Sequence, residues 1–566
     1  MPIDVQLHLW PWSRGIREET PDLSCPFKFW GSPVVSLSRR ATLYLPRRHE
    51  RFLPFGPPFD TRAGEYLLYE TPHGVLAAGN TETTDSTAEI RVHIGTLRES
   101  IRLRPQGAKR IPSQYGGDQE NEGTRLASIV IDWSQFFDDL LDKAKKAGGE
   151  NRLSWAEAIK SIFDVAEDAK QPRKALIVDI AERMRSRLPS IVAAARRILY
   201  RERLMLPAGR IAETDTACLR WMVRQPGDTM ALKAAANRQR LLGIARRESF
   251  DTLENRVLKD FIVRCAMEGR RYDRTEVGDN PGLRQSQRAC TVRQYQNLCA
   301  ELSRMALFDG VAAPPPVPQP NYVLQNDLRY RAIWHHYVRL LKREEEEDCL
   351  WDWQARTWAD VCRFLVCAAL FSLSCEVQRK LFVEEQLASA VNLVAEQRLG
   401  CRILAGSEPG PFLVGLRSRP RSRASILEVV HPEHAGEHPA TRLLGRTGGH
   451  LYFVLTPLDG GRRLVLIIWA VHTAAAKDHP SWKEIGLSAG NALQAHFRIL
   501  DELGDPLFPL LRGFVVASDM DSMAADLHPG MNGDLHLVQV AIDQRYWSEA
   551  LNGIMLVIED ILESVL

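Results

Sequence analysis

Two short apolar segments near the carboxy-terminal end constrain the fold of this chain more than any other feature. The first runs from Gly449 to Leu455 and the second from Leu464 to Thr473, and both are rich in β-branched and aromatic residues. The sequence between them contains Asp459-Gly460-Gly461, a combination typical of turns. We therefore predict a β-hairpin in the core of an α/β domain.

The elements expected after this hairpin extend the pattern. A helix is predicted over 488–503, strands over 513–517 and 535–540, and an amphipathic helix from about Trp547 to Leu566. This order of strand, strand, helix, strand, strand, helix resembles the core of the PD-(D/E)XK nucleases. In that superfamily, an Asp near the first strand and an Asp/Glu-x-Lys on the second bind a divalent metal and activate water.

The positions that would carry this chemistry hold other residues. The first-strand Asp falls on Leu451 or Tyr452, and the Asp-Ala-Lys positions are occupied by Trp469-Ala470-Val471. Mg²⁺ needs hard oxygen ligands, which Trp and Val do not supply. We expect a degenerate nuclease fold with no catalytic residues, no metal and no cofactor. Two alternatives stay open: an ordinary buried hairpin, or an active nuclease whose site has migrated to residues such as Glu428, Asp459, Lys477 and Asp478.

A second resemblance lies upstream, in Glu248–Phe261 (ESFDTLENRVLKDF) and Leu324–Arg331 (LQNDLRYR). Both segments are similar to motifs of a McrC-like bacterial family, found with McrB-like AAA+ ATPases in restriction and anti-phage loci. The motif residues are Glu254, Asn255, Arg256, Arg329 and Tyr330. Because Asp251-Thr252 precedes an apolar-periodic run, a capped helix is expected to begin there. We interpret Glu254 and Arg256 as partners in buried or half-buried ion pairs rather than as a ligand site.

The charge balance limits how the chain could bind nucleic acid. With 73 basic and 71 acidic residues, the formal net charge is +2, so no global positive field is present. Any DNA contact must be local, or the protein is a scaffold that binds no nucleic acid. Candidate DNA contacts lie on helices expected between Ser128 and Leu307, including one over 231–244. The alternative is that the basic faces of these helices are only exposed to solvent and bind nothing. These candidates are Arg183, Arg185, Arg187, Arg196, Arg197 and Arg201.

One cluster has residue types that suit Zn²⁺: His431, Glu433 and His434, with His438 and His450 nearby. Pro432 and Pro439 place it in a loop, which favours a polar surface loop over a metal site. The ten cysteines have no CxxC spacing and are expected to be free thiols.

Four domains are expected: a β-rich domain over 1–125, a helical domain over 126–310, a second helical block over 321–400, and the nuclease-like α/β domain over 401–566. The prolines between 314 and 320 would separate the two helical blocks. No apolar stretch reaches the roughly 18 residues of a membrane span, so we expect a cytoplasmic protein with no membrane contact. The longest candidate is Phe364–Leu373.

These observations lead to one functional hypothesis. The protein is expected to be a non-catalytic subunit of a bacterial anti-phage or restriction-type complex. It would bind DNA, an AAA+ ATPase or other defence subunits, or both. An active metal-dependent endonuclease and a protein-only scaffold are the alternatives.

Overall fold

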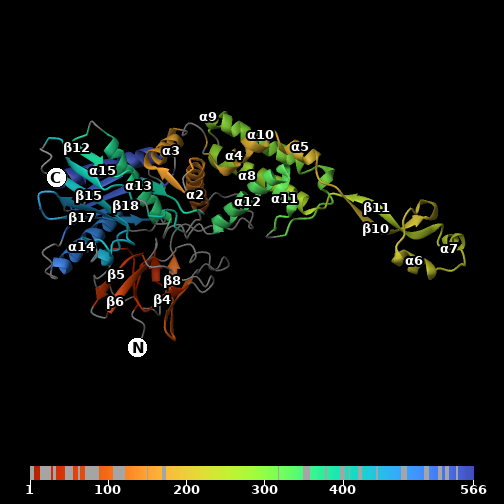
Figure 1. The fold of residues 1–566 in the computed structure, drawn as a ribbon, viewed down its shortest axis with the longest axis horizontal. Coiled ribbons are helices and arrows are strands. Elements are labelled where there is room, and N and C mark those ends of the chain that lie inside the picture. The colour runs from red at the N-terminus through yellow and green to blue at the C-terminus, as the bar shows by residue number, and fades with distance from the viewer. Residues whose placement is uncertain are drawn as a thin grey trace. The chain divides into compact units, whose positions relative to one another are not determined.

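The protein is described from a computed structural model of the chain. The structure describes residues 5–12, 27–29, 34–44, 55–61, 64–70, 88–105, 122–148, 151–167, 172, 174–278, 280–315, 318–348, 357–376, 379–395, 402–406, 408–418, 424–441, 444–472, 481–501, 509–519, 526–529, 534–543 and 546–566. The chain divides into two compact units: residues 1–169 with 343–566, and residues 170–342 (Figure 1).

The amino-terminal part of the first unit is built from strands, as predicted. One sheet has the order β1-β3-β6-β5 and the other β2-β8-β7-β4. The strands are β1 (Val5–His8), β2 (Phe27–Phe29), β3 (Val34–Ser38), β4 (Thr42–Tyr44), β5 (Phe55–Thr61), β6 (Gly64–Glu70), β7 (Ala88–Ile94) and β8 (Leu97–Pro105).

The carboxy-terminal part of this unit contains an eight-stranded mixed sheet of order β12-β14-β15-β16-β17-β18-β20-β19. The predicted hairpin is present as β16 and β17, which pair antiparallel, and every residue of β17 is buried. Strands β17, β18 and β20 are parallel. The strands are β12 (Leu381–Glu385), β14 (Phe412–Leu416), β15 (Ser425–Val430), β16 (Leu451–Pro457), β17 (Leu464–Val471), β18 (Leu510–Asp519), β19 (Asp526–Pro529) and β20 (Leu535–Ala541).

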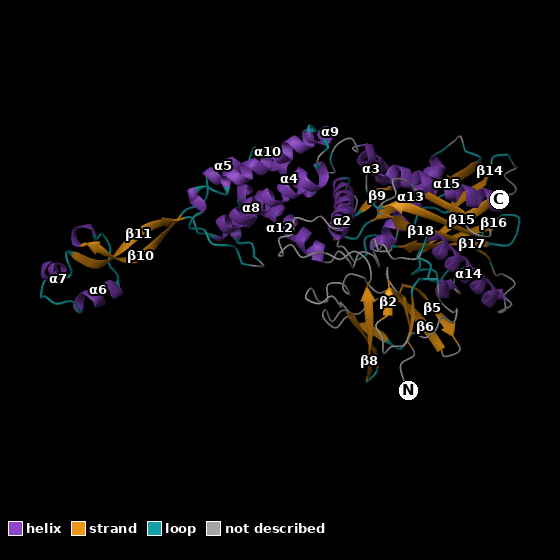
Figure 2. Cartoon of the chain, turned by 180° about the vertical axis from the view of Figure 1, so that it is seen from behind, coloured by secondary structure: helices purple, strands orange, loops and turns teal. Residues whose placement is uncertain are grey.

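Helices cover both faces of this sheet (Figure 2). Leu466, Ile468 and Phe514 belong to a core shared with four helices, α2, α3, α13 and α15, whereas Trp469 and Val515 on the other face belong to a core shared with α14. A short ladder of β9 (Arg152–Ser154) and β13 (Ala390–Asn392) lies in the same unit. The helices are α2 (Glu122–Lys146), α3 (Trp155–Glu167), α13 (Thr357–Cys375), α14 (Trp482–Asp501) and α15 (Trp547–Val565).

The second unit is a helical body with a two-stranded arm that extends away from it (Figures 1 and 2). The arm, residues 196–249, consists of the antiparallel strands β10 (Ile198–Pro207) and β11 (Arg240–Ser249) and a tip, residues 208–240. The tip contains η3 (Ala208–Arg210), α6 (Thr216–Val223) and α7 (Met230–Ala236). The body helices are α4 (Leu176–Met184), α5 (Leu188–Ala193), α8 (Leu253–Tyr272), α9 (Pro281–Arg284), α10 (Gln287–Leu302), α11 (Tyr322–Asn326) and α12 (Leu328–Asp348).

One expected helix is shorter in the structure, and the two compact units have boundaries other than those of the expected domains. The helix expected over 231–244 ends at Ala236, and the chain turns through left-handed conformations at Arg238 (φ 58°) and Gln239 (φ 62°) into strand β11. The prolines near 314–320 fall inside the unit 170–342 rather than between units. Residues 343–400, expected to belong to a separate helical block, are grouped with the carboxy-terminal sheet.

Within the described residues, one helix is long and apolar enough to cross a membrane. It is α13, and 72% of its most apolar window is buried inside the structure. A buried core helix of a soluble protein has this character. The seven cysteines that the structure describes are free.

Candidate functional site

The start of β16 and the end of β17 lie side by side, where the nuclease resemblance places metal ligands. Tyr452 pairs with Ile467 and Leu451 with Ile468. Side chains alternate along a strand, so Tyr452, Trp469 and Val471 share the face covered by α14, and Leu451 lies on the opposite face. Three of the four expected ligand positions are therefore on one face of the sheet.

This face is closed by the side chains that it carries. The Trp469 indole Nε1–H donates to the Thr447 carbonyl at 2.8 Å, and the Tyr452 hydroxyl donates to the Leu444 carbonyl at 3.3 Å. Both acceptors belong to the short turn η8 (Leu444–Thr447). Burial raises the pKa of Tyr452 to about 12, so its hydroxyl remains neutral at physiological pH.

A segment from the amino-terminal end of the chain seals the same face. Trp12 is fully buried, and its ring packs edge-on against Trp469 with centroids 5.6 Å apart. Its Nε1–H donates to the Ser488 hydroxyl at 3.1 Å, and its carbonyl lies 3.2 Å from His496 Nε2. Ser488 and His496 come from α14, so this helix holds the tryptophan over the hairpin.

Gly448 makes this close packing possible. Its φ is +63°, and a Cβ built on it would lie 2.2 Å from the Pro11 carbonyl oxygen. A side chain at this position would clash with the backbone of the amino-terminal segment.

Buried polar groups near the start of β16 form hydrogen bonds and an ion pair with one another. The Asp360 carboxylate accepts from the backbone N–H of Ile403 at 2.6 Å and of Leu404 at 3.2 Å, and forms an ion pair with Arg363. Arg363 Nε–H also donates to the His450 carbonyl at 2.8 Å. No local pattern in the sequence marks this cluster, because its members lie on α13 and in loops distant in the chain. Its internal hydrogen bonds indicate a structural role.

The residues considered for other metal sites do not converge. Glu428 Oε2 lies 3.3 Å from His438 Nε2, and Glu433 forms an ion pair with Arg402 at 2.8 Å. Asp459 lies in the exposed turn at the far end of the hairpin from His450. Lys477 and Asp478 lie outside the described residues. Across the part of the chain that is described, no three His, Cys, Asp or Glu side chains are arranged to hold a metal.

The second unit contains a different feature, a hydrogen-bonded network at the root of the arm. Asn255 Nδ2–H donates to the carbonyls of Arg196 at 2.8 Å and Phe250 at 2.7 Å. The Tyr330 hydroxyl donates to Asn255 Oδ1 at 2.8 Å and accepts from the Arg196 backbone N–H at 2.9 Å. Arg196 precedes β10 and Phe250 follows β11, so Asn255 and Tyr330 join both strands of the arm to α8 and α12.

Ion pairs complete this anchor. Glu254 is buried and pairs with Arg196, and it also accepts from Asn321 Nδ2 at 2.9 Å. Burial opposes ionisation of Glu254, but hydrogen bonds from its own backbone and from Asn321, with the charge of Arg196, lower its pKa overall.

Arg256 and Arg329, the other motif arginines, also form ion pairs. Arg256 pairs with Asp251 at 2.6 Å and is about one third exposed. Arg329 pairs with Asp327 at 3.0 Å.

Most of the arginines considered for DNA binding are already engaged within the second unit. Arg183 pairs with Asp179 at 3.0 Å, and Arg185 donates to Gln294 at 2.5 Å. Arg187 is exposed beside α5. The ion pairs of the other three are Arg196 with Glu254, Arg197 with Glu248, and Arg201 with Glu213.

The arm as a whole carries an excess of basic residues. Twelve basic residues lie between 196 and 249, against five acidic ones: Glu202, Glu213, Asp215, Asp228 and Glu248. Five exposed tip arginines form no ion pair with any residue that the structure describes: Arg210, Arg220, Arg224, Arg238 and Arg240. None of these five arginines is among the DNA-binding candidates that were named from the sequence.

Apolar side chains are exposed on the same tip. Leu219 is 54% and Val223 76% exposed on α6, while Met230 and Leu232 are each 54% exposed at α7. The small core beneath them consists of Cys218, Met222, Ala234, Leu241 and Ile244. The arm thus presents both arginine and large apolar side chains to solvent.

Comparison with known protein families finds a match to the middle of the chain. Residues 128–337 match the model of a domain of unknown function, DUF2357. The matched span contains the whole arm, its anchor and both sequence motifs. No curated protein matches the chain.

Proposed function

We propose that this protein is a non-catalytic subunit of a cytoplasmic, bacterial anti-phage or restriction-type defence complex, and that it binds DNA through the arm. The observation that carries the proposal is the arm itself, whose tip presents five exposed arginines outside any described ion pair. Phosphate contacts by such arginines supply most of the affinity of non-specific DNA binding.

The carboxy-terminal sheet supports the non-catalytic part of the proposal. Its antiparallel β15-β16-β17, crossover helix α14 and parallel β18 have the connectivity of a PD-(D/E)XK core. We infer that it is a degenerate member of that superfamily. The positions of two metal ligands hold Trp469 and Tyr452, whose polar atoms are bonded to backbone carbonyls, and Trp12 packs over them. A divalent ion would find no carboxylate ligand at these positions, and the hydroxyl and carbonyl oxygens there are already hydrogen-bonded.

The experiment is an anisotropy titration of the full-length protein with labelled duplex and single-stranded DNA at two salt concentrations. A cleavage gel with Mg²⁺ or Mn²⁺ uses the same samples. We expect salt-sensitive binding without cleavage. Cleavage would show that the protein is an active nuclease with a migrated site. Absence of DNA binding at both salt concentrations would contradict the proposed role of the arm.

A second function, docking to an AAA+ ATPase subunit, is favoured by the exposed apolar residues of the tip. Exposed apolar clusters commonly mark protein contacts. Val223→Asp at the tip is expected to abolish co-purification with an ATPase co-expressed from the same locus. Leu556→Asp on α15, where the leucine is 51% exposed, serves as the matched control. Equal co-purification of both variants would contradict this contact.

A further inference from the structure

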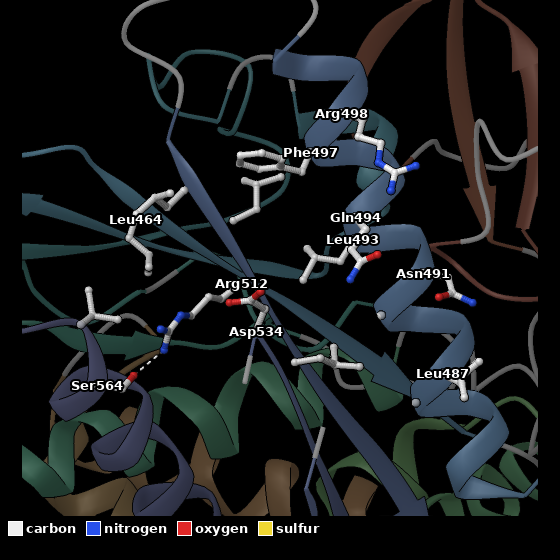
Figure 3. A pocket seen from close by; sticks show the side chains of 16 residues that line it. Leu464, Leu487, Asn491, Leu493, Gln494, Phe497, Arg498, Arg512, Asp534 and Ser564 are labelled. Atoms are coloured by element: carbon white, nitrogen blue, oxygen red, sulfur yellow. Dashed lines mark hydrogen bonds between the residues drawn. The ribbon is translucent and has the colours of Figure 1, made fainter. Parts of the chain in front are cut away.

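A cavity of about 610 Å³ lies between α14, the first residues of β17, β18 and β20, and the end of α15 (Figure 3). Its volume is in the range of small-molecule sites, roughly 300–1,000 Å³. It lies at the Leu464 end of β17, opposite the closed end at Trp469, and is separate from the arm.

The walls of the cavity are mostly aliphatic. Leu464 and Leu511 come from the sheet, and Leu493 and Phe497 from α14. Gly486 and Gly490, one helical turn apart on α14, also line the space. A Cβ at Gly490 would meet only Leu535 Cδ2 at 3.8 Å, and one at Gly486 only Leu537 Cδ1 at 3.9 Å. An apolar molecule could therefore occupy the space beside the helix without displacing backbone.

Arginine supplies the polar chemistry of this cavity. Arg512 is half-buried, and its Nη1 donates to the Ser564 hydroxyl, as Figure 3 shows. A guanidinium has five N–H donors, and no ion pair to a described acidic residue engages Arg512. Asp534 lies beside it, because Gly513 pairs with Leu535 in the sheet.

Two further arginines line the cavity or lie beside a lining residue. Arg498 lines the cavity from α14, and the Arg462 guanidinium lies 5.8 Å from the centre of the Phe497 ring. Among the described residues that line the cavity, Arg498 and Arg512 are basic and only Asp534 is acidic, which favours an anionic ligand.

We propose that the cavity binds a small anionic amphiphile. Its apolar body contacts the leucines and Phe497, and its carboxylate or other anionic group is held by Arg512. This inference is independent of the proposed DNA-binding role, because none of its residues lies in the arm.

Decanoate is a suitable probe, titrated calorimetrically into the full-length protein, with decanol and decyltrimethylammonium as uncharged and cationic analogues. We expect one decanoate per chain and at least about tenfold weaker binding of both analogues. Arg512→Gln should weaken decanoate binding about tenfold and remove the preference for it over decanol. Gly490→Leu, which places an isobutyl group in the cavity beside Leu535, should weaken decanoate binding at least tenfold.

Two controls keep the result interpretable. Gly490→Ala adds only a methyl group in ordinary contact with Leu535 and should leave the protein folded with weakened binding. Arg152→Gln, an exposed arginine on β9 outside the cavity, should bind decanoate like the unaltered protein. The proposal is overturned if the unaltered protein does not bind decanoate, if Gly490→Leu binds it normally, or if decanol binds equally well.

Discussion

Removing one hydroxyl group at the root of the arm is the sharpest test of its anchor. In Tyr330→Phe, the ring remains but the hydroxyl between the Arg196 N–H and Asn255 Oδ1 is lost. Each buried polar group left without a partner costs about 1–3 kcal/mol, so the two groups predict a loss of roughly 2–6 kcal/mol in local stability.

The matched control is Tyr322→Phe, the same chemical change at a side chain that is 78% exposed on α11. Because a chain with several domains does not unfold in one step, the measurement is native-state hydrogen exchange followed by mass spectrometry on the full-length protein. In Tyr330→Phe, exchange should accelerate about thirtyfold or more in peptides covering 196–200 and 250–256. Tyr322→Phe should not change it.

Unchanged exchange in Tyr330→Phe would refute the anchoring role. If DNA or partner binding were lost at the same time, Tyr330 and Asn255 would instead belong to a ligand site.

Three further predictions concern other parts of the chain. Gly448→Ala should lower the unfolding temperature far more than Gly460→Ala: both glycines have positive φ, but only at Gly448 would the added Cβ meet another residue, the Pro11 carbonyl. Equal effects in a thermal scan would show that the amino-terminal segment does not pack there. Burial, with the nearby charges of His335 and Arg339, lowers the pKa of His336 from 6.5 to about 4. In the unfolded protein His336 has its ordinary pKa, so it binds a proton at a higher pH than in the folded protein. The free energy of unfolding should therefore fall by about 2 kcal/mol between pH 7 and pH 5. His336→Leu should remove this loss of stability in calorimetry at the two pH values, whereas His335→Leu, which removes only the smaller contribution of a neighbouring charge, should reduce it in part. Trp469→Asp combined with Val471→Lys should destabilise the fold without producing Mg²⁺-dependent cleavage, since Trp12 and η8 still occupy the site; cleavage by this variant would contradict the closed-site geometry.

The hairpin could be predicted from the sequence because its signal is local. Every residue of Leu464–Val471 is apolar, and such a run is buried wherever it is placed. The order of elements after it followed from the same kind of signal. In contrast, the contact of Trp12 with Ser488 joins residues 476 positions apart, and no local pattern in the sequence indicates it.

The arm was interpreted as helical for a physical reason. Residues of β10 are exposed or half-exposed throughout, so the strand lacks the apolar face that usually marks a strand. Ala231, Leu232 and Ala234 then have helical spacing, which is correct only as far as Ala236. The structure shows an alternation along β10 that is typical of a strand. Its exposed residues are Arg201, Arg203 and Met205, and its half-buried residues are Glu202, Leu204 and Leu206. The motif around Glu254 was identified, but only the structure shows that it fastens the arm.

DNA binding by the tip of the arm is tested by the salt dependence of the binding constant. Anisotropy titrations over a series of salt concentrations would compare the unaltered protein with Arg220, Arg224 and Arg238 all changed to Gln. The control changes three exposed arginines outside the arm, Arg40, Arg98 and Arg102, to Gln. Each phosphate contact contributes about 0.9 to the slope of log K against log salt on duplex DNA, so the tip variant should lose about 2–3 in slope and the control none. Equal slopes for all three proteins would contradict the claim.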